Sequence, residues 1–317
     1  MTSLRLTSLD QLNDQEHSVL DSSELGQSIN QHYLFNPISQ RYYQEYIGPE
    51  AVAKSLIVYD AEKPVLMMPM LSATETFNFA GGPSEIFCHL DDDIQHETIP
   101  FLARKLKKTE TGKLLSFQNN STLLSALFSQ LHSVETTYQG LVDLTLSEDL
   151  IYRSIRKSYR PFVNWGRKEL QLSIIDKSNP DEAEFNDFKK LHITASGRQT
   201  RNDATWDAQM NMIRAGVGYL VNAYFDDELV SSCFVMHDKD IALYAVAASD
   251  RNRMDADQPL NHFPLYSAIL EAKKKGCRVF RIGDVNDTRD AKAENIARFK
   301  RGFITDIKTD QIFTVKL

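Results

Sequence analysis

The chain has 317 residues, of which 42% are hydrophobic and 25% charged; 36 basic and 43 acidic residues give a formal net charge of −7. A single core seldom extends beyond about 250–300 residues, so the length predicts two domains, which we place at residues 1–150 and 151–317. The composition is that of a globular protein and excludes extensive disorder. The acidic balance excludes a general DNA binder, which needs clustered Lys and Arg.

The cysteines and the N-terminus indicate a cellular compartment. The cysteines are far apart and form no CxxC pair, which favours a reducing environment. Residues 1–21 are polar and lack the apolar stretch of a secretory signal, and no run of about 18 apolar residues occurs. We therefore expect a cytoplasmic protein without a transmembrane segment.

The N-terminal half predicts short strands alternating with helices. Residues 1–30 are polar and predict a loosely held segment with one short strand, whereas residues 33–46 are aromatic-rich, as in a packed core or a ligand groove. Residues 55–59 and 65–71 predict a hairpin across the turn at 60–64. Further expected elements are helices at residues 99–108 and 123–131 and strands at residues 114–117 and 138–144.

The C-terminal half has the clearest pattern. Two helices are expected at residues 182–191 and 203–215, followed by three strands joined by short acidic turns at residues 219–225, 229–237 and 241–247. This arrangement predicts an antiparallel meander. The remaining elements are a helix at residues 264–275, a strand at 278–282, a helix at 291–300 and a strand at 312–315. Each half thus runs strands, helix, strand, helix, which indicates a duplicated α/β unit.

Several familiar motifs are absent. The sequence contains no GxGxxG, no GxxxxGK[ST] and no GxSxG, which excludes the usual Rossmann, P-loop and nucleophile-elbow sites. His96-Glu97 lacks the second His of HExxH, and His89 and His96 could bind a metal but have no well-placed third ligand. We therefore expect no metal.

A basic strip opens the second half. Arg153, Arg156, Lys157 and Arg160 are spaced i, i+3, i+4, i+7, which predicts one face of a helix that Pro161 ends. One interpretation is a solvated linker helix between the domains. The other is a surface facing the phosphates of a nucleotide-sugar acceptor or a tRNA donor.

Two further segments offer candidate binding residues. Residues 257–264 enter a helix whose first amides can bind an anion, and there Asn261 or His262 either caps the helix or contacts a ligand; the sequence favours capping. The strand at 278–282 runs into Gly283 and Asp284, so Asp284 lies at a strand end, where α/β sheets bind ligands. Lys300 and Arg301 lie at the end of the next helix, where their charges either interact favourably with the helix dipole or bind a substrate phosphate.

The order of these segments resembles the FemAB-like branch of the GNAT superfamily. The resemblance covers residues 140–305 well and the N-terminal half only by the order of its elements. Residues 144–149 with 155–160 resemble the family's link between its two domains. The other matching segments are the meander, the Pro-Leu-x-x-x-Ile-x-x-Ala-Lys-x-x-Gly helix at 264–276, the Gly-Asp strand end at 283–284, and Phe299-Lys300-Arg301-Gly302-Phe303.

The resemblance implies an α/β (α+β) fold of two tandem GNAT-like (acyl-CoA N-acyltransferase) domains with mixed, largely antiparallel sheets. It implies transfer of an acyl or aminoacyl group to an amine or hydroxyl of a cell-envelope sugar or peptidoglycan precursor, carried by a nucleotide or a lipid. Lys300 would bind the acceptor phosphate and stabilise transition-state charge, and Phe299 would shape the pocket. Arg156 and Arg160 match basic positions of the family loosely, and Asp284 is the candidate general base.

The sequence departs from the family in two places. GNAT enzymes hold the pyrophosphate of CoA with an Arg/Gln-x-x-Gly-x-Gly/Ala loop, but residues 251–257 contain no Gly. Residues 182–215 supply only two ordinary helices in place of the long helical arm of some tRNA-dependent members. We therefore expect no tightly bound cofactor, leave acyl-CoA and aminoacyl-tRNA open as donors, and favour a shorter relative acting on an envelope sugar. The alternative is a non-catalytic ligand-binding or scaffold protein with the same fold.

Overall fold

The computed structural model describes residues 4–74, 76–88, 92–255 and 258–317. The chain separates into two compact units, a first unit of Met1–Thr137 with Asp310–Leu317 and a second unit of Tyr138–Thr309. The sequence-based division at residue 150 differs from these bounds. The first unit ends at residue 137 instead of 150, and it also includes residues 310–317. These last residues belong to it because the last strand pairs with a strand of the first unit, with Ile312 opposite Gln118.

The first unit contains two main sets of strands. The predicted hairpin is confirmed as β3 (Leu56–Asp60) and β4 (Lys63–Met68), which form an antiparallel sheet with β1 (Leu4–Ser8) and β7 (Phe87–Cys88) in the order β1-β3-β4-β7. The second set is β8 (Leu114–Gln118), parallel to β6 (Thr76–Phe77) and antiparallel to β15 (Asp306–Lys316). Strands β2 (Val52–Ala53) and β5 (Leu71–Ser72) form a separate short pair.

The N-terminal segment is more ordered than its polar sequence predicts. Helix α1 (Asp14–Ser22) begins with a capping box, in which the Asn13 side chain accepts from the Glu16 amide and the Glu16 carboxylate accepts from the Asn13 amide. Ser23 caps α2 (Glu24–Gln31) in the same region. The expectation of a loosely held segment is therefore wrong, because polar side chains satisfy the helix amides while Leu20, Leu25 and Ile29 are buried. The other helices of this unit are α3 (Pro37–Ile47), α4 (Asp92–Thr109) and α5 (Ser121–Leu127), with 3-10 turns η1 (Leu9–Gln11) and η2 (Phe128–Gln130).

The sheet of the second unit confirms the predicted meander. Its strands have the order β10-β11-β12-β13-β14-β9, and every neighbouring pair is antiparallel except β13 and β14, which are parallel. The strands are β9 (Leu131–Asp143), β10 (Gln171–Ile175), β11 (Gly218–Phe225), β12 (Glu228–His237), β13 (Ile241–Ser249) and β14 (Val279–Asp284). The sheet is thus mixed and largely antiparallel.

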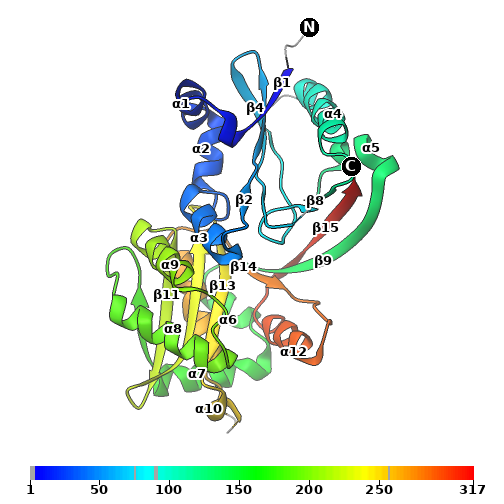
Figure 1. The fold of residues 1–317 in the computed structure, drawn as a ribbon. Coiled ribbons are helices and arrows are strands. Elements are labelled where there is room, and N and C mark those ends of the chain that lie inside the picture. Colours follow the sequence, from blue (N-terminus) through cyan, green and yellow to red (C-terminus); the bar gives the residue numbers. More distant parts are fainter. Residues whose placement is uncertain (1–3, 75, 89–91, 256–257) are drawn as a thin grey trace. The chain divides into compact units, whose positions relative to one another are not determined.

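Helices cover both faces of this sheet. On β11, the Tyr219 hydroxyl donates to the Ala268 carbonyl of α11 (His262–Lys274) at 2.6 Å, whereas the Asn222 amide donates to the Glu184 carbonyl of α8 (Glu182–Ser196) at 3.2 Å. Because successive strand residues point to opposite faces, these bonds place α11 and α8 on opposite sides. Figure 1 shows α8 and α9 (Asp203–Ala215) lying across the strands of the meander.

The basic strip does not form one helix. Helix α6 (Glu148–Ser154) ends before Arg156, the 3-10 turn η3 (Lys157–Tyr159) follows, and α7 (Arg160–Glu169) begins with Pro161 in its first turn. The prediction of a single basic face ended by Pro161 is wrong. Proline lacks an amide hydrogen and has a fixed φ, so it suits the first turn of a helix, where that hydrogen would have no intrahelical acceptor. The helices not yet given are α10 (Arg251–Asp255) and α12 (Ala291–Lys300).

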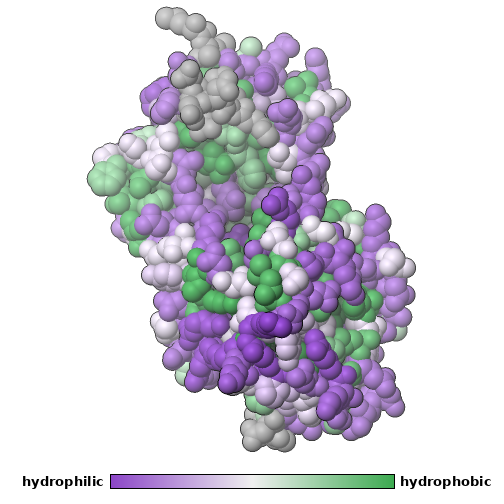
Figure 2. Space-filling view, turned by 180° about the vertical axis from the view of Figure 1, so that it is seen from behind, coloured by the Kyte–Doolittle hydropathy of each residue, from purple (hydrophilic) through white to green (hydrophobic). Residues whose placement is uncertain are grey.

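The surface alternates in character. Figure 2, which views the molecule from the side opposite to Figure 1, shows apolar areas interspersed with hydrophilic ones. Large exposed apolar side chains of the second unit include Leu150, Phe162, Met254 and Ile296. Scattered exposure of this kind is ordinary in folded chains. In the described part of the chain, no helix is both long enough and apolar enough to cross a membrane.

An ion pair joins the segment after β10 to the end of α11, and it makes stability depend on pH. Burial raises the pKa of Asp176, but hydrogen bonds from Lys275 and Ser178 and the charge of Lys275 outweigh burial and lower it to about 2. Because the folded pKa lies below the unfolded value, the stabilisation is present above about pH 4 and is lost as the pH falls toward 2. Between pH 5 and pH 2, we expect the unfolding free energy of wild type to fall by about 1–2 kcal/mol more than that of Asp176→Asn, measured by urea titration. Equal losses in the two proteins would contradict this assignment.

Candidate functional site

The ends of β14 and α12 bring Lys300 next to Asp284. Helix α12 starts with the Asp290 side chain accepting from the Ala293 amide at 2.7 Å, and it ends at Lys300. The Lys300 ammonium donates to the backbone carbonyl of Asp284 at 3.4 Å. Gly283 permits this approach, because its φ is +92° and a Cβ there would lie 3.0 Å from the Lys300 Nζ.

The Lys300 ammonium lies at a pocket of about 230 Å³. Burial lowers the pKa of Lys300, and the charges of Asp284 and Asp287 oppose this shift. Asp287 itself is occupied by Arg289, whose two hydrogen bonds to it measure 2.9 and 2.6 Å and hold the Asp287 pKa at about 2. Among the described residues, no carboxylate forms a direct ion pair with Lys300. The lining residues are Asp284, Asp287, Arg289, Asp290, Lys292, Ala293, Ile296, Ala297 and Lys300.

Arg301 has a different environment. Its guanidinium donates to the backbone carbonyl of Val285 at 2.6 Å and so ties the end of α12 to the chain that leaves β14. It does not line the Lys300 pocket. This contact holds the strand end and the helix end together, while a contact of Arg301 with substrate stays a prediction.

Phe299 belongs to an aromatic cluster that also contains His262, the first residue of α11. The centroid of the Phe299 ring lies 5.2 Å from that of His262, 5.3 Å from that of Phe303 and 6.1 Å from that of Tyr159. The ring centroids of His262 and Tyr159 are 4.6 Å apart. Burial lowers the pKa of His262 to about 4, against a smaller opposing effect of the Pro259 carbonyl. The imidazole is therefore neutral near pH 7 and packs with the cluster. Its contact with a ligand stays a prediction.

Asn261 occupies the N-cap position of α11 but does not cap it with its side chain. Its backbone is helical, with φ −97° and ψ −17°, whereas a capping residue is normally extended. The Asn261 carbonyl oxygen instead accepts from the hydroxyls of Ser231, at 2.9 Å, and of Ser249. The expectation of capping is wrong, because the side chain fastens the loop to β12 and β13. Asp257, at the start of the predicted binding segment, lies outside the described residues.

The two candidate arginines of the basic strip are held locally. The Arg160 guanidinium donates to the carbonyl of Ile155 at 3.0 Å and to that of Arg153, which satisfies the C-terminal end of α6. Arg156 is exposed, and its guanidinium lies 4.9 Å from the centroid of the Tyr159 ring and donates to the Tyr159 hydroxyl at 3.3 Å. Arg156 is thus connected to the Phe299 cluster through Tyr159, a residue that the sequence did not single out.

The segment at the position of the expected CoA loop is helical as far as Asp255. Arg253 of α10 pairs with Glu228 at 2.5 Å and lies 3.6 Å from Asp250. Residues 256 and 257 lie outside the described residues. The amides of Asn252 and Arg253, in the first turn of α10, donate to the Asp250 side chain at 2.9 and 3.3 Å. They are therefore not free to hold a pyrophosphate.

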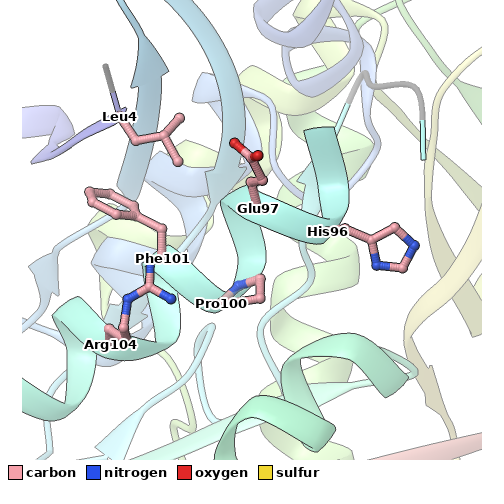
Figure 3. A pocket seen from close by; sticks show the side chains of 6 residues that line it. All are labelled: Leu4, His96, Glu97, Pro100, Phe101 and Arg104. Carbon is pink, nitrogen blue, oxygen red and sulfur yellow. The ribbon is translucent and has the colours of Figure 1, made fainter. Parts of the chain in front are cut away.

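A larger pocket of about 380 Å³ lies in the first unit and contains no residue that the sequence predicted. Five of its lining residues come from α4, and Figure 3 shows Phe101 turned toward Leu4 of β1 while His96 points away. His96, Glu97 and Arg104 are exposed, so the charges of Glu97 and Arg104 are largely screened by solvent. The Lys300 pocket differs from this one because its cation is half-buried.

Comparison with known proteins identifies the fold of the chain. The sequence matches no protein-family model and no curated protein. Three similar solved structures each share 13% sequence identity with the chain, and the first is FemX, with a TM-score of 0.62, covering 99% of this chain and 97% of that one. The second is the C-terminal domain of a proposed lysylphosphatidylglycerol synthetase from Agrobacterium fabrum, with a TM-score of 0.61, covering 95% of this chain and 93% of that one. The third is a tandem GNAT protein from the clavulanic acid biosynthesis pathway, with a TM-score of 0.53, covering 99% of this chain and 98% of that one. The chain therefore has the FemAB-like fold of tandem GNAT-like domains.

Proposed function

We propose that the protein is an acyl- or aminoacyltransferase whose acceptor is an amine or hydroxyl of a cell-envelope sugar or peptidoglycan precursor. The observation that carries the proposal is the Lys300 ammonium, which is half-buried at a pocket by the end of β14 and bonds only to the Asp284 carbonyl among the described residues. The likeness in fold to FemX and to a tandem GNAT protein supports the reaction class.

A phosphate of the acceptor suits this position. Burial of Lys300 without a direct ion pair costs free energy, which a phosphate oxygen would offset as counter-charge. Nucleotide-linked and lipid-linked sugar precursors both carry such phosphates. Phe299, next to Lys300, would contact the sugar from the aromatic cluster, and Arg301 would keep the end of α12 beside β14.

The reaction would be direct transfer. The acceptor nitrogen or oxygen attacks the donor carbonyl carbon, a new C–N or C–O bond forms, and the bond to the CoA sulfur or the tRNA ribose oxygen breaks. The Asp284 carboxylate is the candidate to take the acceptor proton, and the Lys300 ammonium would stabilise negative charge in the transition state. Holding both substrates in line supplies much of the rate.

The donor is acyl-CoA or aminoacyl-tRNA. Helix α10, in place of a glycine loop, disfavours the usual CoA cradle in the second unit. The ordinary helices α8 and α9, in place of a long helical arm, disfavour a tRNA-dependent member with that arm, so both donors stay open. The exposed Arg156 offers a cation for tRNA phosphate. Because both donors are made in the cytoplasm, we place the reaction there.

A non-catalytic binding or scaffold protein is the second candidate. It is favoured by the same helix α10, since a chain without a donor site would still have the acceptor pocket at Lys300. Such a protein would bind a phosphorylated sugar without changing it.

A thermal-shift screen separates the two functions. The full chain is heated with acetyl-CoA, with charged tRNA or with a uridine-diphosphate amino sugar, and then with each donor and the sugar together. A transferase is expected to gain about 2.7 kcal/mol of stability from each ligand present at 100 times its Kd, and therefore to be stabilised by both a donor and an acceptor. Stabilisation by the sugar alone, with none from either donor, would contradict the transferase.

A further inference from the structure

The turn η3 packs against the end of α12, although the two segments are far apart in sequence. The Arg156 amide donates to the Gly302 carbonyl at 2.8 Å. The Tyr159 ring lies 6.1 Å from Phe299 and 5.7 Å from Phe303, so it faces the residues that flank Lys300 and Arg301. The turn thus contacts the helix end through both its backbone and a ring.

Gly302 shows how close this contact is. A Cβ at Gly302 would lie 2.0 Å from the Cε2 and 2.4 Å from the Cδ2 of Tyr159. The backbone of Gly302 is not left-handed, so its conformation would accept an alanine. The ring of Tyr159, and not the backbone, therefore excludes a side chain at Gly302.

The Tyr159 ring is also held on its other sides. The Arg156 guanidinium lies 4.9 Å from the ring centroid and donates to its hydroxyl at 3.3 Å. The His262 ring meets it edge-on at 4.6 Å. A ring confined by a cation, an imidazole and a glycine backbone has little freedom to move, so it restrains the residues at the end of α12 that pack against it.

We propose that Tyr159 is a positioning residue that holds the end of α12 so that the Lys300 ammonium stays at its pocket. Its effect on transfer rests on the proposed function, whereas its effect on Lys300 does not. Lys300 follows Phe299 directly, so a tilt of the last turn of α12 would move the ammonium away from the Asp284 carbonyl and into solvent. The depressed pKa of Lys300, which arises first from burial, reports on that placement.

The test measures the titration of Lys300 in the folded full chain. The protein is acetylated with acetic anhydride at a series of pH values, and modification of Lys300 is quantified by mass spectrometry. In wild type we expect a midpoint below the ordinary value of about 10.4, and in Tyr159→Leu a midpoint that moves up toward it. Tyr159→Phe keeps the ring and should keep the wild-type midpoint. The matched control is Phe162→Leu, which removes a neighbouring ring whose centroid lies 6.4 Å from that of Tyr159.

Gly302→Ala reaches the same contact from the opposite side. It should raise the Lys300 midpoint as Tyr159→Leu does, and the double variant should shift it no further, because both changes act through one contact. If neither single variant moves the midpoint, or if Phe162→Leu moves it as far, Tyr159 is not the positioning residue. Where Tyr159→Leu does not fold, as judged by circular dichroism, Gly302→Ala decides the question.

A transfer assay separates this proposal from the proposed function. If wild type transfers an acyl group, Tyr159→Leu should lower kcat about tenfold with little change in donor KM, as expected for a misplaced group. If KM rises while kcat is unchanged, the positioning role in catalysis is overturned. If wild type transfers nothing, the proposed function fails, but the Lys300 titrations still decide whether Tyr159 positions that side chain.

Discussion

Replacing Lys300 by Ala is expected to lower the transfer rate by about 10²–10³-fold, the usual cost of removing one group that stabilises transition-state charge. The ammonium lies at the pocket with the Asp284 carbonyl as its described partner. Of the other cations that line the pocket, Arg289 is paired with Asp287 and Lys292 is exposed, so the substitution removes the half-buried charge. Rates are measured with the donor and acceptor that stabilise wild type.

The matched control for this substitution is Lys190→Ala. Lys190 is exposed on α8 and pairs with Asp187 at 2.9 Å, outside the pocket. It should transfer at the wild-type rate. Near-wild-type turnover of Lys300→Ala would remove Lys300 from the reaction, and an equal loss in Lys190→Ala would point to an unspecific effect of charge.

Phe280→Ala is expected to destabilise the second unit by about 3–5 kcal/mol, as large-to-small changes of aromatic residues in cores do. Phe280 is fully buried on β14, opposite Ala242 of β13 on one side and Val142 of β9 on the other. The cavity would open directly before the Gly283–Asp284 strand end that approaches Lys300.

Urea titration of the full chain measures this loss. Leu150→Ala, on the exposed surface of α6, serves as the control and should change the unfolding free energy by less than about 0.5 kcal/mol. A change of similar size in the two variants would show that β14 is not at the centre of the core. Phe280→Leu should lie between wild type and Phe280→Ala, because it leaves a smaller cavity.

The elements nearest the site were the most predictable. Helix α12 was predicted with the bounds that the structure has, and the meander and β14 were predicted to within a few residues. These segments have strong local patterns, such as alternating apolar residues in β14 with Phe280 and Ile282 buried. The sequence named Asp284 and Lys300 as candidates at a strand end and a helix end, and the structure adds the contact between the Lys300 ammonium and the Asp284 carbonyl.

Other features depend on interactions that a local pattern does not record. The helices α1 and α2 exist because Asn13 and Ser23 cap them, and a polar segment with short helices has little apolar periodicity. The basic strip was misassigned because Pro161 suits the start of a helix as well as its end. The contact of Tyr159 with Gly302 joins distant parts of the chain, and one sequence alone does not predict such a pair.

The most direct test of the proposed transferase is the transfer itself. The full chain is incubated with a radiolabelled donor and the acceptor that together stabilise it. The acceptor is then recovered, and its mass is measured by mass spectrometry. We expect the labelled acyl or aminoacyl group to appear on the acceptor nitrogen or oxygen, and Lys300→Ala to lose most of this product. An acceptor recovered unchanged, with every donor and acceptor pair that stabilises the chain, would contradict the account and leave a binding protein with the same fold.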